Sequence, residues 1–412
     1  MNGRPVYSIA DSLGKLSRRW LSHGYSFRRE AVKRLTHVSG FSERMAEAMI
    51  EATFSELTPG KIRAFLRAEL KNPLALDAWA YDAESQKWLK ARGPKKIFHI
   101  FSSNIPNAAV WSFVSGLLLK SSNVGKLSRR DGGFLEIYLK SLKTADLKLW
   151  RHCELIRPDD RKGAQKHLKE SDLVVAYGSD ESLTQIRNQV PGTTPFCGYG
   201  HRVSAAVYLK EALTEKGLGP LARASARDLW MADQRGCLSP VAIYIQKGGR
   251  VSPEEFSRVL AACLKKIQKN EKTPPKRDLA SLRESREAQN RQAMRQLKGK
   301  HSLIFQSNPP GRWTVSYDET LRPVLGSSSQ TITVQGFKKI DQAFKTLSSF
   351  QKYLQCIALE CVPAQRKRLA EKLSEINVNR VCRAGKMQNP PLTWHHDGKP
   401  TLAHWIQWTD LE

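Results

Sequence analysis

Along the first ninety residues, hydrophobic side chains recur with the period of an amphipathic helix. The clearest run is Ala46, Met49, Ile50, Phe54 and Leu57, whose three- and four-residue spacing places them on one helical face. Helix-breaking residues follow at Pro59-Gly60 and at Pro73. We therefore predict a helical segment over residues 8–90.

From residue 95 onward, short apolar runs alternate with helical patterns. Predicted strands cover 97–101, 173–177, 205–209, 241–245 and 331–334, and predicted helices begin at Pro106 and cover 253–269. This alternation is typical of a parallel sheet with crossover helices, so we expect the α/β fold class. Residues 278–300 are charged on nearly every face, which predicts a solvated helix, with a nucleic-acid-binding arm as the alternative.

Composition adds a strong positive charge to this picture. Hydrophobic residues make up 40% of the 412 residues, enough to bury cores in about two or three domains of ordinary size. Lysine and arginine outnumber acidic residues by 67 to 39, a net charge of +28. Nucleic acid, phosphorylated cofactors, acyl carriers and anionic membrane surfaces all fit this charge.

Some classes of protein do not fit the chain. Residues 1–20 carry four bases but no uninterrupted apolar run, unlike a secretory signal. The longest apolar stretch, 105–119, is too short and too polar to span a membrane. The seven cysteines show no C-x-x-C and no Cys/His ligand spacing, which disfavours zinc. We expect a cytoplasmic protein with reduced cysteines, no metal and no transmembrane segment.

The segment 233–240 (DQRGCLSP) carries the first candidate reactive group. Cys237 follows Gly236 at the entrance of a predicted strand. There its thiol and backbone N–H can both face a ligand, as a covalent nucleophile requires. A buried structural cysteine is the alternative.

A second candidate lies in 101–107 (FSSNIPN), between a predicted strand and a predicted helix. Asn104 can direct its amide donors into the crevice at the strand's carboxyl end and stabilise an oxyanion. The same residue can simply cap the helix that follows.

Two further segments have features of phosphate sites. In 176–187 (AYGSDESLTQIR), Gly178 and Ser179 open a helix whose N-terminus suits a phosphate, although an ordinary capped helix has the same pattern. The loop 126–130 (KLSRR) contains three bases and Ser128, and can either grip a phosphate or remain solvated.

Together these segments resemble the aldehyde dehydrogenase superfamily, and within it the LuxC-type acyl-CoA reductases of the bacterial fatty acid reductase complex. The resemblance covers roughly residues 95–412, and its most specific strings are 199–204 (YGHRVS), 233–240 and 393–398 (TWHHDG). It implies a Rossmann-like cofactor domain, an α/β catalytic domain and reduction of an acyl thioester to an aldehyde through a cysteine acyl-enzyme.

Residue by residue, the resemblance implies catalytic roles for two positions. Cys237 matches the nucleophile, and Asn104, followed by Pro106, matches the asparagine that holds the oxyanion. The segment 182–210 contains no Asp or Glu, whereas aldehyde-oxidising members carry there the glutamate that activates water. This departure favours an acyl-enzyme that awaits hydride. Gln234 is a second departure, because it stands three residues before the cysteine instead of the usual two.

The resemblance also implies a nicotinamide cofactor. Gly178 and Ser179 match the turn under its pyrophosphate, Lys126 the lysine that holds the adenosine ribose, and Glu319 the glutamate that binds the nicotinamide ribose. NAD-preferring members carry a glutamate three residues after that lysine. Here Arg129 stands in its place, and a guanidinium suits a 2′-phosphate, so NADPH is the expected cofactor.

Other residues have competing interpretations. His201 can act as an acid or base near the thioester, or can be a hydrogen-bonded structural histidine. The cluster 394–397 contains adjacent histidines without a third ligand at useful spacing and predicts a structural corner. The tryptophans 394, 405 and 408 predict packing or subunit contact.

We therefore expect an N-terminal helical segment (1–90), a cofactor-binding Rossmann-like domain (91–212), a catalytic domain (213–380) and a C-terminal segment (381–412) that returns to the cofactor domain. The preferred function is an NADPH-dependent acyl-CoA reductase acting on a long-chain substrate. The alternatives are another reductase of the superfamily with a small acyl substrate, and a basic nucleic-acid-binding protein. Expected partners are acyl-CoA, an acyl-protein synthetase and further copies of the chain.

Overall fold

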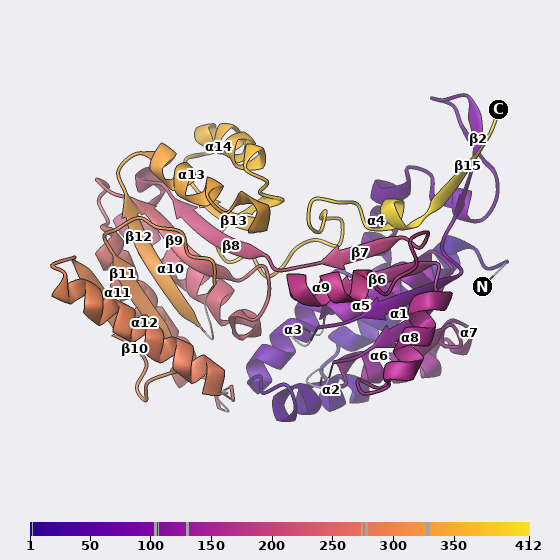
Figure 1. The fold of residues 1–412 in the computed structure, drawn as a ribbon, viewed down its shortest axis with the longest axis horizontal. Coiled ribbons are helices and arrows are strands. Elements are labelled where there is room, and N and C mark those ends of the chain that lie inside the picture. Colours follow the sequence, from indigo (N-terminus) through magenta and orange to yellow (C-terminus); the bar gives the residue numbers. More distant parts are fainter. Residues whose placement is uncertain are drawn as a thin grey trace. The chain divides into compact units, whose positions relative to one another are not determined.

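The computed structural model describes residues 1, 3–102, 105, 107–128, 132–272, 275–276, 279–326 and 330–412, without the side chains of 279–281, 284, 285 and 288. The chain forms two compact units (Figure 1). The first unit comprises 1–39, 46–201 and 391–412, and the second comprises 40–45 and 202–390. The C-terminal segment thus belongs to the unit that contains the N-terminal helices.

The first unit begins with helices, as the hydrophobic periodicity predicts. These are α1 (Val6–Leu21), α2 (Ser26–His37), α3 (Glu43–Ser55), α4 (Pro59–Leu70) and the short 3-10 helix η1 (Pro73–Leu76). The helical prediction is wrong beyond residue 76, because β1 (Ala80–Asp82) and β2 (Lys87–Arg92) are antiparallel strands. The C-terminal strand β15 (Gln407–Leu411) pairs with β2, a partner that no local pattern reveals.

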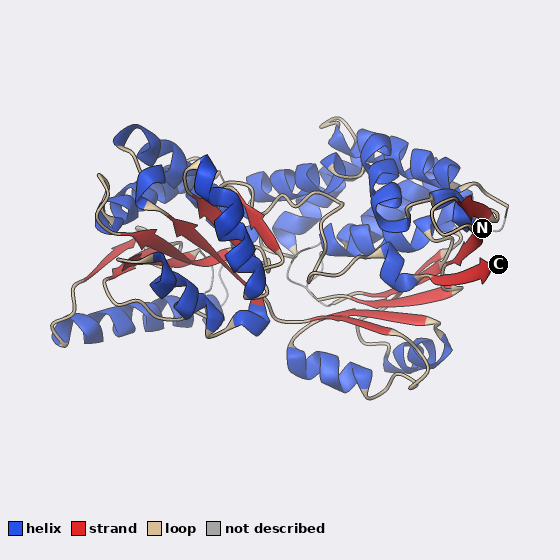
Figure 2. Cartoon of the chain, turned by 90° about the horizontal axis from the view of Figure 1, so that it is seen from above, coloured by secondary structure: helices blue, strands red, loops and turns tan. Residues whose placement is uncertain are grey.

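A five-stranded parallel sheet forms the centre of the first unit, in the order β5-β4-β3-β6-β7. Its strands are β3 (Lys96–Ile100), β4 (Ser122–Lys126), β5 (Cys153–Ile156), β6 (Leu173–Tyr177) and β7 (Phe196–Tyr199). Helices flank both of its faces (Figure 2). They are α5 (Asn107–Leu118), α6 (Phe134–Ala145), α7 (Leu147–Trp150), α8 (Arg161–Glu170) and α9 (Asp180–Arg187), with α15 (Leu402–Trp405) in the C-terminal segment. The strand order reverses direction between β3 and β6, which makes this a Rossmann-like sheet with a topological switch point.

The second unit contains a seven-stranded sheet in the order β10-β11-β12-β9-β8-β13-β14, parallel except for β10. Its strands are β8 (Val203–Tyr208), β9 (Pro240–Gln246), β10 (Ser302–Gln306), β11 (Thr314–Asp318), β12 (Thr331–Phe337), β13 (Leu354–Glu360) and β14 (Arg380–Cys382). Its helices are η2 (Lys210–Ala212), α10 (Glu215–Trp230), η3 (Met231–Gln234), α11 (Pro253–Lys269), α12 (Leu279–Leu297), α13 (Ile340–Ser348), η4 (Gln351–Tyr353) and α14 (Pro363–Glu375).

The unit boundaries differ from the expected domain boundaries. The first crossing lies at 201/202 instead of 212/213, and the second at 390/391 instead of 380/381. The physical reason is pairing, because β8 lies between β9 and β13 in the seven-stranded sheet. Residues 40–45 join the second unit although the rest of the N-terminal helical segment belongs to the first.

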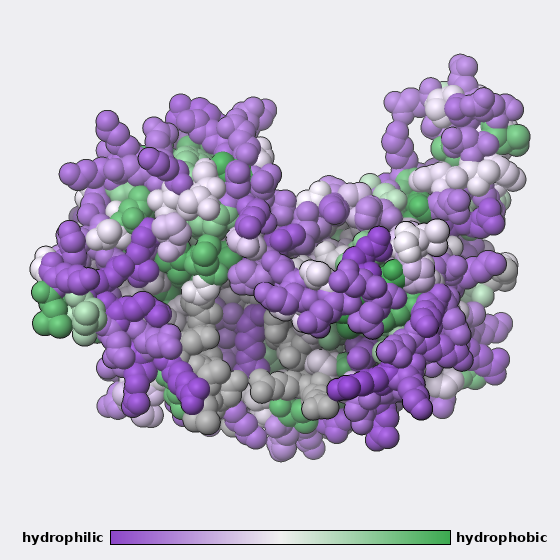
Figure 3. Space-filling model, in the orientation of Figure 1, coloured by the Kyte–Doolittle hydropathy of each residue, from purple (hydrophilic) through white to green (hydrophobic). Residues whose placement is uncertain are grey.

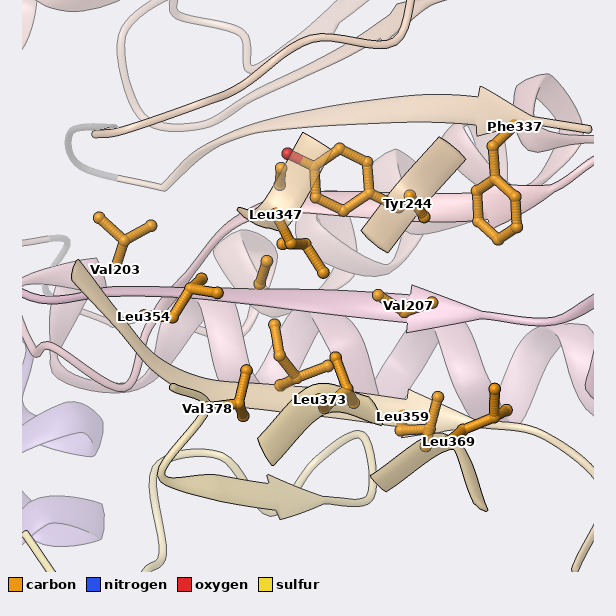
Figure 4. Close-up of a cluster of buried hydrophobic side chains, with 14 of the residues drawn as sticks. Val203, Val207, Tyr244, Phe337, Leu347, Leu354, Leu359, Leu369, Leu373 and Val378 are labelled. Atoms are coloured by element: carbon orange, nitrogen blue, oxygen red, sulfur yellow. The ribbon is translucent and has the colours of Figure 1, made fainter. Parts of the chain in front are cut away.

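An apolar core surrounds the central strands β8, β9 and β13, which are buried at nearly every position. Val203, Val207 and Leu359 of the central strands pack with Leu347 of α13 and Leu373 of α14 (Figure 4). Strands covered on both faces by helices bury both sides of the pleat. Within the part of the chain that the structure describes, no helix is long and apolar enough to cross a membrane.

Candidate active site

The carboxyl ends of β3 and β6 flank the switch point of the first unit, the place where open α/β sheets bind ligands. Directly after β6, Ser179 caps α9, because its hydroxyl accepts a hydrogen bond from the Ser182 N–H at 3.3 Å. The pKa of the exposed Glu181 carboxyl is lowered, first by its own backbone N–H and next by the Ser179 hydroxyl. This helix N-terminus therefore favours a negative charge, as a pyrophosphate subsite requires.

The same turn fixes the chain that leaves β7. The Gly178 N–H donates to the Tyr199 carbonyl at 3.2 Å, so this donor is already used within the protein. Asp180 accepts a hydrogen bond from the His201 N–H at 3.2 Å. A side chain at Gly200 would meet the Asp180 carboxylate, 2.5 Å from where its Cβ would lie, so glycine permits this close approach.

Lys126 ends β4 and is half-buried, as is Ser128 two residues later. The Ser128 hydroxyl is buried and has no hydrogen-bond partner among the described residues. A buried polar atom without a partner is costly in a folded protein, so this hydroxyl has the capacity to bind a polar ligand. Arg129, the residue predicted to select NADPH, lies outside the described residues, as does Asn104.

In the second unit, Cys237 lies in a tight turn between η3 and β9. Its side chain is half-buried, and the turn is closed by a hydrogen bond from the Ser239 N–H to the Gly236 carbonyl at 2.9 Å. The three residues Ala232, Asp233 and Gln234 have φ values of 54°, 53° and 59°. Each such left-handed residue costs roughly 1–2 kcal/mol when it is not glycine, and backbone strain of this kind concentrates at functional sites.

Two buried side chains hold this strained segment in place. Gln234 donates to the carbonyls of Pro240 and Thr331 at 2.8 and 2.9 Å and accepts from the Thr331 N–H at 2.8 Å. Asp233 accepts from Gln330 at 2.9 Å and pairs with Arg235 at 3.4 Å. Gln234, the glutamine whose position departs from the superfamily pattern, thus ties the starts of β9 and β12 together.

Ser204 is a contributor to this site that sequence reasoning did not single out. Its buried hydroxyl donates to the Cys237 carbonyl at 2.7 Å and accepts from the Cys356 N–H at 3.2 Å. Ser204 is the last residue of the YGHRVS string, and that string was the only sequence signal that could have pointed to it. His201 is exposed, three residues earlier in the chain, at the boundary between the units.

Glu319 does not lie beside Cys237. It follows β11 at its carboxyl end, where its carboxylate accepts from the His301 N–H at 3.1 Å. Cys237 precedes β9 at its amino end, and β11, β12 and β9 are adjacent parallel strands. Glu319 and Cys237 therefore lie at opposite ends of these parallel strands, Glu319 at the carboxyl end and Cys237 at the amino end. The nicotinamide-ribose role of Glu319 stays a prediction, and this placement weighs against it.

The TWHHDG segment belongs to the first unit and packs by stacking. The His396 ring lies 4.5 Å from Tyr199 and 4.9 Å from Trp394, centroid to centroid, and Tyr199 stacks on Tyr177 at 4.8 Å. This aromatic corner therefore lies against the ends of β6 and β7, beside the Ser179 turn. Across the described ranges, no group of three or more His, Cys, Asp or Glu side chains could hold a metal ion.

The sequence has relatives with described activities. The sequence model of the family "Acyl-CoA reductase (LuxC)" matches residues 2–408. A long-chain acyl-protein thioester reductase of Photorhabdus laumondii is 24% identical over 253 residues, 58% of this chain and 50% of that protein. Its counterpart in Vibrio harveyi is 21% identical over 406 residues, 93% and 80% of the two chains. The chain thus spans about half the length of the Photorhabdus relative it matches.

Solved structures share the fold at low sequence identity. A NAD-dependent benzaldehyde dehydrogenase from Corynebacterium glutamicum aligns with a TM-score of 0.69 and 12% identity, covering 99% of this chain and 86% of that one. An oxidoreductase from Marinobacter aquaeolei aligns with a TM-score of 0.75 and 12% identity, covering 100% and 87%. At this identity the likeness establishes the aldehyde dehydrogenase fold and nothing about substrate.

Proposed function

Because the chain belongs to the acyl-CoA reductase (LuxC) family, we propose that it reduces a long-chain acyl thioester to the aldehyde, with Cys237 carrying the acyl group. The observation that carries this proposal is the Cys237 turn. A half-buried thiol follows three left-handed residues, and its own carbonyl is held by the buried Ser204. A nucleophile in a turn held this rigidly is positioned before substrate arrives.

The proposed reaction proceeds by acyl transfer to Cys237 followed by reduction. The Cys237 thiolate attacks the thioester carbonyl, the substrate thiol leaves, and the acyl group remains on sulfur. A reduced nicotinamide bound to the first unit would supply the hydride, and the thioester on Cys237 would then become a thiohemiacetal. The sulfur then leaves as thiolate and releases aldehyde. Asn104, outside the described residues, is proposed to hold the oxyanion together with the Cys237 N–H, and His201 is proposed to exchange a proton with the thiohemiacetal oxygen.

The first unit offers polar groups that fit a dinucleotide. The α9 N-terminus stabilises a nearby carboxylate, and the buried Ser128 hydroxyl has no partner among the described residues. With Lys126 half-buried at the end of β4, we assign the pyrophosphate to the Ser179 turn and the adenosine side to Lys126 and Ser128. The preference for NADPH rests on Arg129 and is part of this proposal.

Hydride transfer is favoured over hydrolysis because the chain lacks an acidic residue in the segment where aldehyde-oxidising members of the superfamily carry the glutamate that activates water. The segment 182–210 has no Asp or Glu. Asp233, four residues before Cys237, is fully buried and engaged by Gln330 and Arg235. An acyl-enzyme in such a site persists until a hydride donor arrives.

The acyl donor can be either coenzyme A or a protein thiol, because both present the same thioester bond. The Photorhabdus and Vibrio relatives are named for acyl-protein substrates. A chain with a net charge of +28 suits the phosphates of coenzyme A and an acidic acyl-protein alike. We propose that an acyl-protein synthetase supplies the acyl group where the donor is a protein.

The test is covalent labelling without cofactor. The protein is incubated with long-chain acyl-CoA labelled in the acyl chain, and peptide mass spectrometry locates the label. We expect acylation of Cys237, none in Cys237→Ala, and normal labelling in Cys263→Ala, which removes another half-buried cysteine. Addition of NADPH should release aldehyde and remove the label.

Two results would contradict the proposal. The first is aldehyde formation at the normal rate by Cys237→Ala. The second is steady multiple-turnover formation of free acid from aldehyde and oxidised cofactor without coenzyme A, which would require a water-activating base.

A further inference from the structure

Two buried cysteines lie side by side in the second unit. Cys356 of β13 and Cys382 of β14 have their sulfurs 3.6 Å apart. Cys356 is fully buried, whereas Cys382 keeps 9% of its surface exposed. The strands are parallel neighbours in which Cys356 faces Arg380 and Cys382 faces Ala358. The two cysteines are thus diagonal neighbours on adjacent strands, without a bond between them.

The two thiols are not equivalent. The pKa of Cys382 is lowered, chiefly by the hydrogen bond between the two sulfurs, while that hydrogen bond and burial raise the pKa of Cys356. Arg380 keeps its guanidinium 3.6 Å from the Cys356 sulfur and is itself held by the carbonyls of Lys386 and Met387. A nearby fixed cation favours thiolate character. The Arg380 charge lowers the pKa of both thiols, so the difference between them comes from their mutual hydrogen bond, which leaves the more exposed Cys382 the more acidic of the two.

We propose that Cys356 and Cys382 form an oxidisable dithiol site that a small peroxide converts to a disulfide. The Cys382 thiolate attacks one peroxide oxygen, giving a sulfenic acid and one water after protonation. The Cys356 thiol then attacks the sulfenic sulfur and expels a second water. Two thiols and hydrogen peroxide thus give one disulfide and two waters, with both electrons passing to the peroxide.

The site is linked to Cys237 through Ser204. The Cys356 N–H donates to the Ser204 hydroxyl at 3.2 Å, and that hydroxyl donates to the Cys237 carbonyl at 2.7 Å. The ladder register shifts between Leu354 and Ile357 of β13 and between Ser204 and Ala205 of β8. Both linking residues thus lie at irregularities, where the ladder of backbone hydrogen bonds is locally disrupted.

Formation of the Cys356–Cys382 disulfide therefore displaces Cys356, whose N–H holds the Ser204 hydroxyl that positions Cys237. A disulfide needs its sulfurs about 2.05 Å apart, so the pair must close by roughly 1.5 Å from the 3.6 Å separation. Displacement of Cys356 at the irregularity changes its hydrogen bond to Ser204. The Cys237 turn then loses part of its support, and the reactivity of the Cys237 thiol changes. Ser204 is in this sense a positioning residue.

The first experiment asks whether the disulfide forms. The whole protein is treated with graded hydrogen peroxide, remaining thiols are blocked with N-ethylmaleimide, and peptides are analysed by mass spectrometry. We expect a linked Cys356–Cys382 peptide, two hydrogens lighter, that dithiothreitol reverses. Cys382→Ser and Cys356→Ala should both lack it, while Cys361→Ser, which removes another buried cysteine, should retain it. Separate maleimide or sulfinic acid adducts on both cysteines, without the linked peptide, would overturn the proposal.

The second experiment measures the link to Cys237 without using enzymatic activity. The rate of Cys237 alkylation by iodoacetamide is compared before oxidation, after it, and after reduction. We expect a several-fold, reversible change in the wild type and none in Cys382→Ser given the same peroxide dose, which also reports direct oxidation of Cys237. An unchanged alkylation rate in the linked protein would disprove the link through Ser204. A failure of the reductase proposal would affect neither readout.

Discussion

The residues before Cys237 show how a few side chains can support a costly backbone. Three consecutive left-handed residues together cost roughly 3–6 kcal/mol at about 1–2 kcal/mol each. Gln234 and Asp233 offset this cost through hydrogen bonds to the starts of β9 and β12. Ser204 adds a further bond to the Cys237 carbonyl. The strain is thus confined to the turn that presents the thiol.

Replacing Gln234 by alanine should therefore destabilise the turn. The change leaves the buried Pro240 carbonyl and the part-buried Thr331 carbonyl and N–H without their partner, at about 1–3 kcal/mol for each unsatisfied group. Urea denaturation should show that the unfolding free energy falls by an amount of this order. The rate of Cys237 alkylation should also change. Gln185→Ala, on the exposed face of α9, serves as the control and should be close to neutral. Equal stabilities of the two variants would refute the role of Gln234.

Asp228 predicts a pH dependence of stability. Burial raises its pKa to about 7, although it accepts hydrogen bonds from the Gly385 and Met387 N–H groups. A carboxyl whose folded pKa exceeds its unfolded value of 3.8 stabilises the fold fully below that value. The contribution declines as pH rises and is lost above about pH 7. In Asp228→Asn, this fall in unfolding free energy between pH 5 and pH 8 should be absent.

The control for Asp228 is Asp341→Asn, an exposed carboxyl on α13, which should keep the wild-type slope. His99 acts in the opposite sense, because burial lowers its pKa to about 4 and its stabilisation is lost as pH falls through the range 6.5 to 4. Because wild type and Asp228→Asn both contain His99, the difference between their stability profiles reports Asp228 alone. A slope in Asp228→Asn equal to that of wild type would show that Asp228 does not titrate in this range.

At the scale of elements, our proposal assigns different parts of a dinucleotide to the turns after β4 and β6. The α9 N-terminus offers a dipole and capped donors, whereas the loop after β4 offers Lys126 and the buried Ser128 hydroxyl. Both β4 and β6 pair in parallel with β3, so the two turns lie at the same, carboxyl end of the strands. Under this proposal, the choice between NADH and NADPH depends on the charge of Arg129, which follows Ser128 in the sequence.

Reversing the charge at Arg129 should change that choice. A glutamate accepts hydrogen bonds from the ribose hydroxyls and repels a 2′-phosphate, so Arg129→Glu should raise the KM for NADPH far more than that for NADH. Lys265→Glu makes a similar charge change on the exposed face of α11 and should leave the ratio of KM values alone. If both variants keep the wild-type ratio, Arg129 does not touch the 2′-phosphate.

At the scale of the whole molecule, the three-stranded sheet β1-β2-β15 has features of a surface that pairs with a second copy of the chain. Its residues include hydrophobic and neutral positions among hydrophilic ones in Figure 3. Large apolar side chains are exposed there, namely Trp79, Tyr81, Trp88, Trp408 and Leu411. Both outer strands, β1 and β15, have a free edge in the described sheet, and exposed apolar edge strands favour pairing with another chain.

We therefore predict a homo-oligomer that depends on this sheet. Trp88→Arg should lower the molar mass measured by light scattering after size-exclusion chromatography, because it places a charge in the buried interface. Leu147→Arg changes an equally exposed apolar residue on α7 and should have no effect on mass. A monomeric wild type at micromolar concentration would rule out this interface.

Local pattern predicted the elements that bury a continuous apolar face. The strand 173–177 and the helix 253–269 have the predicted bounds, because apolar runs and helical spacing report burial directly. The candidate nucleophile and the candidate phosphate-binding turn could both be named from the sequence, because each occupies a short string at a strand boundary. The strands β1 and β2 were missed because they bury few residues and so lack a marked apolar pattern. The pairing of β2 with β15 was missed because the two segments lie more than three hundred residues apart.

The sequence by itself thus determined the α/β class, the family resemblance and the identity of the candidate cysteine. Only the tertiary structure decided that Ser204 holds the Cys237 carbonyl and that Cys356 meets Cys382. It also decided that Glu319 and Cys237 lie at opposite ends of the parallel strands. The physical reason is the range of the interactions involved. Periodicity and turn chemistry act between residues a few positions apart, whereas these hydrogen bonds and contacts depend on the order in which distant strands join one sheet.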